Sequence, residues 1–533
     1  MKFAVLMAAV CMFMTVGTFA QDSRGVILGT MSDPQGGTIA AADVQLTNVA
    51  TNITTHKTTN SSGYFEFPFM SIGTYNVSVA APGFKTYTRN DVVLSIGARL
   101  TLDLKLEIGR VSEAVTVTAE TSLLNTGDAS SGRVVTKSEI DRLPVPLTNS
   151  LNLAHLAPGI VFTGDSTQQR ADSYGGTAAF ATMGNVGRNE WTMDGVPITG
   201  TSYRPGFTPD TDAVEELKVE TTNFDASSGF GAGINVNLST KGGSNHYHGS
   251  LFDQHNQQRW NATPHFARLA WQDAVRKGQV SPSTPEQASG RQNIFGVDLG
   301  GPVRIPKLYN GTDKLFFYFN YNGILQTASA IVGLGSGPNY NVPQDAWWKG
   351  DFSQLLKIDP VKYTIYDPRS AQMVNGHVVR TPFPGNQVPI LNPMVKAYQA
   401  LYPHANNVPG IVTADGLGGY FAGNMPYVTT YNQGMNRIDY NISQNHRIFA
   451  KWFYSRADYN SADWTYESDP GLMSSAVMRQ GRGITANYVW TISNSTIMSV
   501  TAGVSSYNEG STNKMQTAFK PSDVGLPTYL DDQ

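Results

Sequence analysis

The side chains that could do acid–base or metal chemistry are few in this sequence, and their spacing does not suit catalysis. Zinc peptidases hold their metal with histidine and glutamate at short fixed intervals, as in His-Glu-x-x-His on a helix. That motif is absent, and none of the nine histidines has a glutamate three residues later. His246 and His248 would project from one face of a strand, with His255 not far off, and we interpret them as a polar strand face or turn. We predict no metal site.

Nucleophilic and phosphate-binding motifs are also missing. The sequence contains no Gly-x-Ser-x-Gly elbow, and its one cysteine, Cys11, lies in the first twenty residues. The glycine triplet in residues 229–233 precedes an expected strand, whereas a phosphate loop leads into a helix. Glu215 and Glu216 stand side by side at the start of a strand, where a solvated face is the simpler interpretation. We therefore predict that the protein is not an enzyme and needs no cofactor.

The composition favours strands and excludes several classes of protein. The chain has 533 residues, and only 15% of them are charged, compared with about 25% in ordinary soluble domains. Glycine (52 residues) and other small polar and aromatic residues are abundant, which favours strands and turns over helices. The formal net charge is −3, so we expect no nucleic acid as a partner. The length requires several structural units.

Residues 1–20 have the pattern of a secretory signal peptide. Lys2 precedes an apolar run, and small residues surround a cleavage point after Ala20. The alternative is a buried N-terminal helix, which this run suits poorly because it has no polar face. Removal of the segment would leave an exported chain without cysteine, so disulfides could not stabilise it. No later stretch reaches the roughly 18–20 apolar residues of a spanning helix, so membrane insertion would require strands closed into a barrel.

Residues 21–108 are predicted to form a small β-sandwich. Turn signals at 33–37 and 60–63 separate short alternating runs, of which Leu100, Leu102, Leu104 and Leu106 form the clearest. A linker, residues 109–122, follows and contains a short β-prone stretch whose residues are Glu113, Ala114, Val115, Thr116, Val117, Thr118 and Ala119. This stretch could be one more strand of the sandwich, or an unpaired strand held ready for the sheet edge of a partner.

Residues 123–245 are predicted to form a small α+β unit. Thr136 to Glu139 has capping-box spacing and should open a short helix, and Thr148 could cap a second helix through Leu156. Asp194-Gly195 occupies the two turn positions of an expected hairpin. Strands are expected over 214–220 and 234–240.

From residue 246 onward, longer strands alternate an aromatic or aliphatic face with a polar face. The pattern is clearest in residues 295–300, 315–322, 437–442, 484–493 and 498–505. Strands of about ten residues with this alternation are typical of a transmembrane β-barrel, although a large secreted sandwich could show it too. Aromatic residues near strand ends favour the barrel, because they gather at membrane interfaces; they are Tyr440, Trp452, Tyr454 and Trp490. The long polar segments 254–290 and 327–430 are expected to be extracellular loops.

Two parts of the chain resemble known protein families, because several motifs of each family occur in the same order along the sequence. Residues 21–108 resemble the carboxypeptidase regulatory-like domain, a transthyretin-like sandwich, through segments 29–33, 42–44, 62–65, 73–75 and 82–84. The later pieces resemble a TonB-dependent outer-membrane receptor, through segments 143–160, 193–197, 214–219, 229–243 and 247–252. An arginine–glycine pair usual in that family is replaced by residues 221–225, as in the subgroup that carries a regulatory-like domain.

The second resemblance implies a function. It makes residues 123–245 the plug domain, residues 246–533 the N-terminal part of an outer-membrane β-barrel, and Glu113–Ala119 the site that binds TonB of the inner-membrane energy complex. The implied activity is TonB-energised uptake of a scarce solute, which could be a siderophore, cobalamin, an oligosaccharide or a peptide. A passive porin or adhesin, and a secreted binding sandwich without transport activity, remain as alternatives. Barrels of this family are expected to have 22 strands, whereas we count seven, so we also expect this chain to be a fragment.

Overall fold

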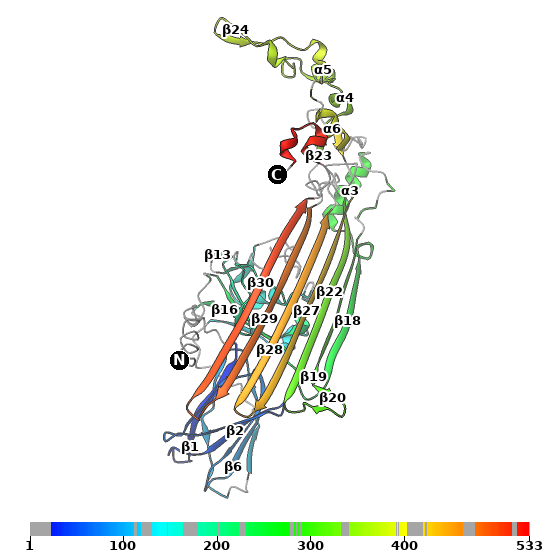
Figure 1. Ribbon diagram of the computed structural model, residues 1–533. Helices are drawn as coiled ribbons and strands as arrows, with labels where there is room; N and C mark the ends of the chain where they lie inside the picture. The colour runs from blue at the N-terminus through cyan, green and yellow to red at the C-terminus, as the bar shows by residue number, and fades with distance from the viewer. Residues whose placement is uncertain are drawn as a thin grey trace.

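The computed structural model describes most of the chain as β-structure. It covers residues 23–110, 114–118, 131–145, 148–163, 180–182, 184–200, 203–222, 231, 233–277, 282–283, 285–287, 290–331, 340–390, 392, 394–401, 419–421, 424–461, 475–513 and 520–531. The predicted signal peptide lies outside these residues. Three bodies follow one another: a sandwich, an inner domain and a tall curved sheet, here called the wall (Figure 1). The predicted mainly-β fold class is confirmed.

The sandwich has two sheets that enclose a core of alternating apolar residues. One sheet has the order β3-β2-β5-β6-β9, and the other has the order β4-β1-β7 with β8 also paired to β1. Their bounds are β1 Gly25–Ser32, β2 Asp43–Asn48, β3 Thr54–Thr58, β4 Tyr64–Met70, β5 Gly73–Ala80, β6 Thr86–Leu94, β7 Arg99–Thr101, β8 Leu104–Lys105 and β9 Ala114–Thr118. Residues from both sheets, such as Ile27 and Val44, are fully buried between them.

One predicted strand of the sandwich is wrong in detail. The alternating run from Leu100 to Leu106 forms two short strands, β7 and β8, that pair with successive parts of β1 in parallel. All four leucines are nevertheless buried, as the alternation predicted. Leu102 lies between the two strands, and its amide donates to the carbonyl of Leu28 across a gap of 2.7 Å.

The inner domain, residues 131–240, is an α+β unit built on a mixed five-stranded sheet of order β10-β16-β17-β14-β15. The predicted helix after Thr136 is confirmed as α2, whereas the second predicted helix is a 3-10 helix (η2) whose cap is Asn149 and not Thr148. A second, three-stranded sheet packs beside it. The bounds are β10 Ser131–Val135, α2 Lys137–Ile140, η2 Ser150–Leu156, β11 Ile160–Phe162, β12 Phe180–Thr182, β13 Asn185–Val186, β14 Glu190–Met193, β15 Val196–Pro197, η5 Thr211–Ala213, β16 Val214–Thr222 and β17 Asn235–Thr240.

The wall is an antiparallel sheet of seven strands in sequence order, the number counted from the sequence. The bounds are β18 His248–Gln257, β19 Gly290–Pro302, β22 Leu315–Ile331, β27 Asn424–Ser443, β28 His446–Ser461, β29 Ser475–Thr491 and β30 Ile497–Asn513. Burial alternates strictly along β28: Lys451, Phe453, Ser455 and Ala457 are buried, while the residues between them are exposed. One face of the wall therefore packs against other parts of the chain and the other face is free.

The connections at the two ends of the wall differ. Tight turns and the short pair β20 (Arg304–Ile305) and β21 (Tyr309–Asn310) join strands at one end. Long connections lie at the other end, and they carry η6 Gln258–Trp260, α3 His265–Arg276, β23 Tyr340–Val342, α4 Asp345–Trp348, α5 Ser353–Ile358, η7 Pro368–Ser370, β24 Gln372–Val374, β25 His377–Val379, η8 Pro384–Asn386, α6 Met394–Leu401 and β26 Gly419–Phe421. The short 3-10 helices η9 Pro521–Val524 and η10 Thr528–Leu530 follow the last strand. The expected loops 254–290 and 327–430 are shorter than predicted, because β18 and β22 continue to Gln257 and Ile331.

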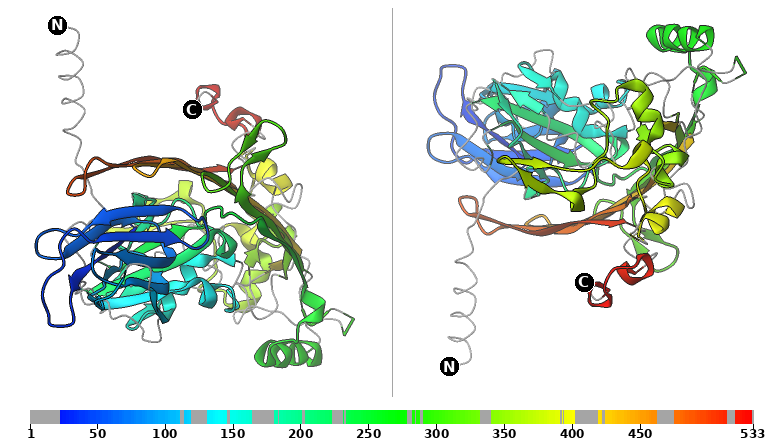
Figure 2. Two further views of the ribbon diagram at one scale, coloured as in Figure 1. Left: turned by 90° about the horizontal axis from the view of Figure 1, so that it is seen from below. Right: turned by 90° about the horizontal axis from the view of Figure 1, so that it is seen from above.

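The three bodies stack along the wall. The inner domain lies on the concave side of the wall, and the sandwich lies beyond it at the tight-turn end (Figures 1 and 2). Of the helices that the structure describes, none has the length and apolar character needed to cross a membrane.

Candidate functional site

The hairpin between β14 and β15 brings an aspartate to the wall. Met193 pairs with Val196 across the turn, as the Asp-Gly sequence predicted. The two turn residues, Asp194 and Gly195, have φ values of 50° and 79°. Such a turn needs residues that tolerate the left-handed region, which aspartate and glycine do. The turn places the carboxylate of Asp194 at the surface that faces the wall.

The carboxylate of Asp194 is held by donors from both bodies. Lys451 of β28 donates to it from Nζ at 2.6 Å, and the guanidinium of Arg437 of β27 lies 3.6 Å away. Within the inner domain, Thr240 donates from its hydroxyl at 2.5 Å and from its amide at 3.0 Å. Lys451 is 0% exposed and Asp194 is 7% exposed, so this ion pair is almost entirely buried. One buried carboxylate therefore links the inner domain to two neighbouring strands of the wall.

A second acid completes this group of charges. Arg437 binds Asp439 with both ends of its guanidinium, at 2.8 Å and 2.9 Å, and its remaining nitrogen donates to the hydroxyl of Thr240 at 3.2 Å. Two acids and two cations thus neutralise one another, as a buried site requires. Burial alone would raise the pKa of Asp194, but the charges of Lys451 and Arg437 and the hydrogen bonds from Lys451 and Thr240 lower it to about 2. The carboxyl group of Asp194 is therefore ionised at every physiological pH.

A further carboxyl group lies deep in the inner domain. Asp210 is 0% exposed, and one of its carboxylate oxygens, Oδ2, has no hydrogen-bond partner in the described structure. Burial, followed by the nearby charge of Asp212, raises its pKa to about 7. The wall adds a contact here, because the hydroxyl of Tyr318 donates to the carbonyl of Asp212 at 2.5 Å.

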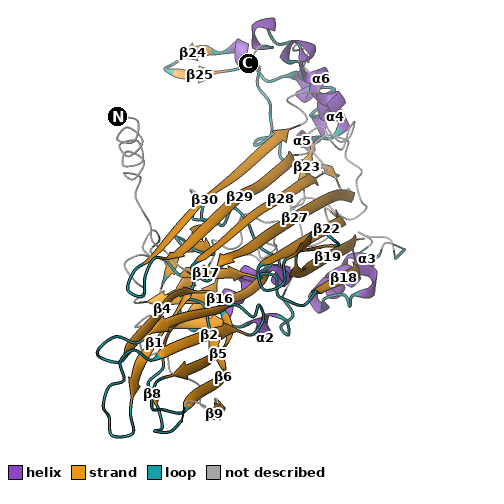
Figure 3. Ribbon diagram, turned by 60° about the horizontal axis from the view of Figure 1, so that its bottom comes forward, coloured by secondary structure: helices purple, strands orange, loops and turns teal. Residues whose placement is uncertain are grey.

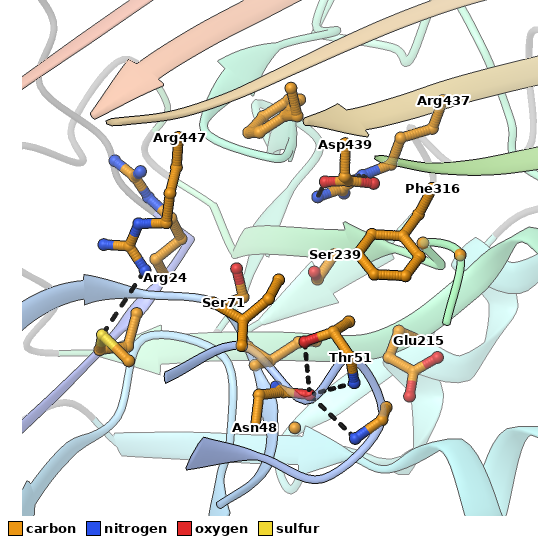
Figure 4. Close-up of a pocket in the computed structure, with 18 of the residues that line it drawn as sticks. Arg24, Asn48, Thr51, Ser71, Glu215, Ser239, Phe316, Arg437, Asp439 and Arg447 are labelled. Carbon is orange, nitrogen blue, oxygen red and sulfur yellow. Dashed lines mark hydrogen bonds and ion pairs between the residues drawn. The ribbon is translucent and has the colours of Figure 1, made fainter. Parts of the chain in front are cut away.

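A cavity of about 410 Å³ opens where the sandwich, the inner domain and the wall meet. Its lining combines apolar side chains with polar side chains and charges of both signs, and all three bodies contribute. Figure 4 labels Arg24, Asn48, Thr51, Ser71, Glu215, Ser239, Phe316, Arg437, Asp439 and Arg447. The charged group around Arg437 forms one side of the cavity. Loss of the ion pair would therefore let water from this cavity reach the interface between the inner domain and the wall.

The sandwich contacts both other bodies next to this cavity. Glu216 of β16 accepts hydrogen bonds from the amide of Ile96 at 2.7 Å and from the hydroxyl of Ser95 at 3.2 Å. Burial of Glu216 is the main reason that its pKa is raised to about 7. On the wall side, Arg24 donates to Asn487 at 2.9 Å and to Ser499 at 2.6 Å. The sandwich is thus hydrogen-bonded to the rest of the molecule and not only tethered to it.

The stretch predicted to bind TonB is partly described. Glu113 and Ala119 lie outside the described residues, and Ala114–Thr118 forms β9. This strand pairs in parallel with β6, Ala114 opposite Thr86 and Thr118 opposite Asn90. It is therefore an extended segment at the end of a sheet of the sandwich, and nothing in this arrangement tests whether it binds a partner.

Sequence reasoning missed the residues that hold the inner domain to the wall. Arg437 was placed on the polar face of a predicted strand, but Lys451 was not singled out. A charged residue on the inward face of a barrel strand is a usable signal, since such a residue needs a partner inside. In the part of the chain that the structure describes, no group of three histidine, cysteine or acidic side chains could hold a metal ion.

The wall is a tall antiparallel sheet whose outward face is largely apolar, and it curves around a folded domain. These features are those of a membrane β-barrel protein that holds a folded domain inside its barrel. Comparison with known families matches residues 239–533 to the outer membrane β-barrel domain and residues 26–107 to the carboxypeptidase regulatory-like domain. The first match covers more than half of the chain, so the chain belongs to the outer membrane β-barrel family. Its place in the outer membrane follows, as predicted, and the tight-turn end of the wall is then the periplasmic end.

Comparison with individual proteins gives further similarities. The chain is 26% identical over 314 residues to the TonB-dependent transporter Oar of Myxococcus xanthus, a match that covers 57% of this chain and 27% of that protein. It is also similar to the outer membrane transporter YddB of Escherichia coli, with 10% identity, a TM-score of 0.43, and coverage of 72% of this chain and 39% of that one. A mutant of the ferric enterobactin receptor of Pseudomonas aeruginosa matches with 12% identity, a TM-score of 0.33, and coverage of 71% and 41%. The chain thus spans about a quarter of the length of the curated relative.

Proposed function

We propose that this chain is part of a receptor that takes up a scarce solute across the outer membrane, with the inner domain as its plug and TonB as its source of energy. The observation that carries this proposal is the position of the inner domain, which packs on the inward face of the wall and is joined to it by the Asp194–Lys451 ion pair. The name of the relative from Myxococcus xanthus, a TonB-dependent transporter, supports the same function.

Close packing between the inner domain and the wall supports a closed resting state. Tyr318, Met435 and Phe453 of the wall belong to the same buried cluster as the core of the inner domain. The rings of Phe207 and Phe453 lie 4.4 Å apart between centroids. A beta-carbon on Gly481 of the wall would come within 2.1 Å of the carbonyl of Gly206, so the two backbones approach closely there. A solute could not pass along this part of the wall unless the inner domain moved.

A plug that is held by buried charges and apolar contacts needs work to move it. The stretch Glu113–Ala119 precedes the inner domain along the chain, and we propose that it receives this work from TonB. Adding a strand to the sheet of a partner provides firm but reversible attachment through main-chain hydrogen bonds, and alternate side chains select the register. Residue types in this stretch suit such pairing, since Val115 and Val117 would share one face.

Val117→Pro tests the coupling, because proline removes an amide donor and restricts the backbone. In cells that make the full-length gene product, we expect this variant to reach the outer membrane and bind solute normally but to lose energised uptake. Val117→Ile, which keeps the backbone pattern, should transport normally. Uptake and surface binding must be measured separately, with a panel of siderophores, cobalamins, oligosaccharides and peptides, because the solute is not identified.

Two results would refute the proposed function. Normal energised uptake by the Val117→Pro variant would show that the strand is not the coupling site. Constant conductance in planar bilayers that is unchanged when residues 123–245 are deleted would show that the inner domain does not close the barrel, and would favour a passive porin.

A further inference from the structure

The sandwich holds β9 in an extended conformation at the end of a sheet. Five successive residues of β9 pair with β6, and β9 is the last strand in the order β3-β2-β5-β6-β9 (Figure 3). On its other side, the strands that the structure describes offer β9 no partner. One row of its backbone groups is therefore open to another strand.

The opposite edge of the same sheet is protected. β3 carries His56 and Lys57, and charged side chains on an edge strand discourage pairing with another chain. The wall also covers this edge, since Lys57 donates to the carbonyl of Asn494, and the side-chain amide of Asn494 donates to the hydroxyl of Thr58 at 2.6 Å.

Among the residues that the structure describes, none protects the β9 edge in these ways. Its sequence, Ala-Val-Thr-Val-Thr, contains no charge, no proline and no glycine, and its residue types favour strands. An edge strand of this kind invites pairing with a further strand unless a natural partner covers it. The contrast between the two edges of this sheet indicates that a partner covers the β9 edge in some state of the protein.

The order of elements along the chain allows a partner to pull on β9 without first removing it from the sandwich. The sandwich lies before β9, while residues 119–130 lead from β9 to β10, which pairs with β16 in the inner domain. Tension applied at β9 would reach β10 directly through those residues. The contact between β6 and β9 is not on this path.

We propose that the sandwich presents β9 as a preformed edge strand, and that the periplasmic domain of TonB adds its own strand to the open edge while β9 stays paired with β6. This inference rests on the function proposed above. It gives the sandwich a defined role, because a segment that is already extended does not have to be ordered when the partner binds. The opposite arrangement, in which β9 must leave β6 before the partner can bind, would make the sandwich an inhibitor.

A disulfide between β6 and β9 separates these two arrangements. Thr88 and Thr116 are paired in register, and neighbouring strands lie about 4.8 Å apart, within the range that a disulfide spans. The only native cysteine, Cys11, lies in the predicted signal peptide, so Thr88→Cys/Thr116→Cys would form the one cysteine pair of the exported protein. The purified full-length receptor would be titrated with the purified periplasmic domain of TonB, before and after reduction of the disulfide.

If β9 is presented on the sandwich, the disulfide should form, and the affinity for TonB should change by less than about twofold on reduction. An affinity at least about tenfold weaker in the oxidised protein, recovered on reduction, would overturn the proposal, because β9 would then have to leave β6. Failure of the two cysteines to form a disulfide would also overturn it.

A matched pair in the same sandwich controls for the disulfide itself. Thr47 and Thr54 are paired between β2 and β3, with their hydroxyl oxygens 3.1 Å apart, and both strands lie away from β9. Thr47→Cys/Thr54→Cys should leave TonB binding unchanged in both redox states. If neither oxidised nor reduced protein binds TonB in any variant, the proposed function itself fails, which is distinct from failure of the presentation of β9.

Discussion

At the scale of single residues, Asp194 carries the attachment of the inner domain to the wall. It is one carboxylate, yet it binds cations from two strands and both donors of Thr240. A buried ion pair of this kind adds little net stability compared with apolar residues of the same shape, but the loss of one partner is costly because the other charge stays buried alone. The pair therefore helps to hold the inner domain in its docked position and makes that position sensitive to the loss of either charge.

The Asp194–Lys451 pair can be tested with single and double substitutions. Lys451→Met and Asp194→Asn should each destabilise the docked inner domain by about 3–5 kcal/mol, because each leaves a buried charge without its partner. The double variant should be destabilised less than the sum, since it removes both charges. Amide hydrogen exchange in β14 and β17 measures the effect. Additive effects in the double variant would show that the two side chains do not interact.

At the scale of elements, successive side chains along each wall strand alternate between the face that meets the inner domain and the outward face. On β30, Ser505 faces the inner domain and donates to the carbonyl of Pro197 at 3.2 Å, and a beta-carbon on Gly503 would contact Val196. The intervening residues, including Val500 and Val504, are therefore on the outward face, where they are 50% and 63% exposed. Arg482, at the middle of β29, is also on an outward face and marks a level that tolerates charge, so the apolar belt lies between Arg482 and the tight-turn end.

Two arginine substitutions on the outward face of β30 test which part of the wall faces lipid. Val500→Arg should reduce stability or assembly in the outer membrane by about 2–4 kcal/mol, because it places a charge in the apolar belt. Asn508→Arg is on the same face of the same strand but closer to the extracellular end than Arg482, so it should have little effect. The amount of folded protein in outer-membrane fractions measures both. Equal effects of the two substitutions would contradict the position of the belt.

At the scale of the whole molecule, the sandwich lies against the inner domain and the wall at the tight-turn end (Figure 1). It contacts the inner domain through Glu216 and the wall through Arg24 and Lys57. The cavity that remains between the three bodies is where movement of any one of them would first admit water. The contacts that hold the sandwich and those that hold the inner domain on the wall are thus close together, although different side chains make them.

Docking of the sandwich should depend on pH through Glu216. Burial, together with the charge of Glu215 and partly opposed by hydrogen bonds from Ile96 and Ser95, raises its pKa from 4.5 to about 7. The docked state therefore keeps a proton that the undocked state releases between about pH 4.5 and 7, so docking weakens as pH rises through this window and is constant above it. The full effect is on the order of 3 kcal/mol at most.

Glu216→Gln isolates this effect, since the amide can still accept from Ile96 but does not titrate. Hydrogen exchange at Ser95 and Ile96, measured between pH 5 and 8 and corrected for the intrinsic rate, should show loss of protection with rising pH in the natural protein and none in the variant. Identical profiles for the two proteins would assign the pH dependence to another group.

The sequence by itself determined the local features of this protein. Period-two alternation predicted the wall strands and their number, because one face of each strand must be buried and the other must not. Asp194-Gly195 predicted its hairpin, because few residue types tolerate two successive left-handed positions. The order of motifs was sufficient to recognise a barrel protein with a regulatory-like domain before any contact was known.

Only the tertiary structure decided which distant residues meet. Asp194 and Lys451 are 257 positions apart, and the sequence around either residue does not indicate that the other is its partner. The pairing of β9 with β6, the docking of Glu216 on Ile96 and the split of the leucine run into β7 and β8 are of the same kind. Alternation specifies which face of a strand is buried. The residues that this face contacts depend on how the sandwich, the inner domain and the wall pack together. That packing is determined by burial and charge pairing over the whole chain.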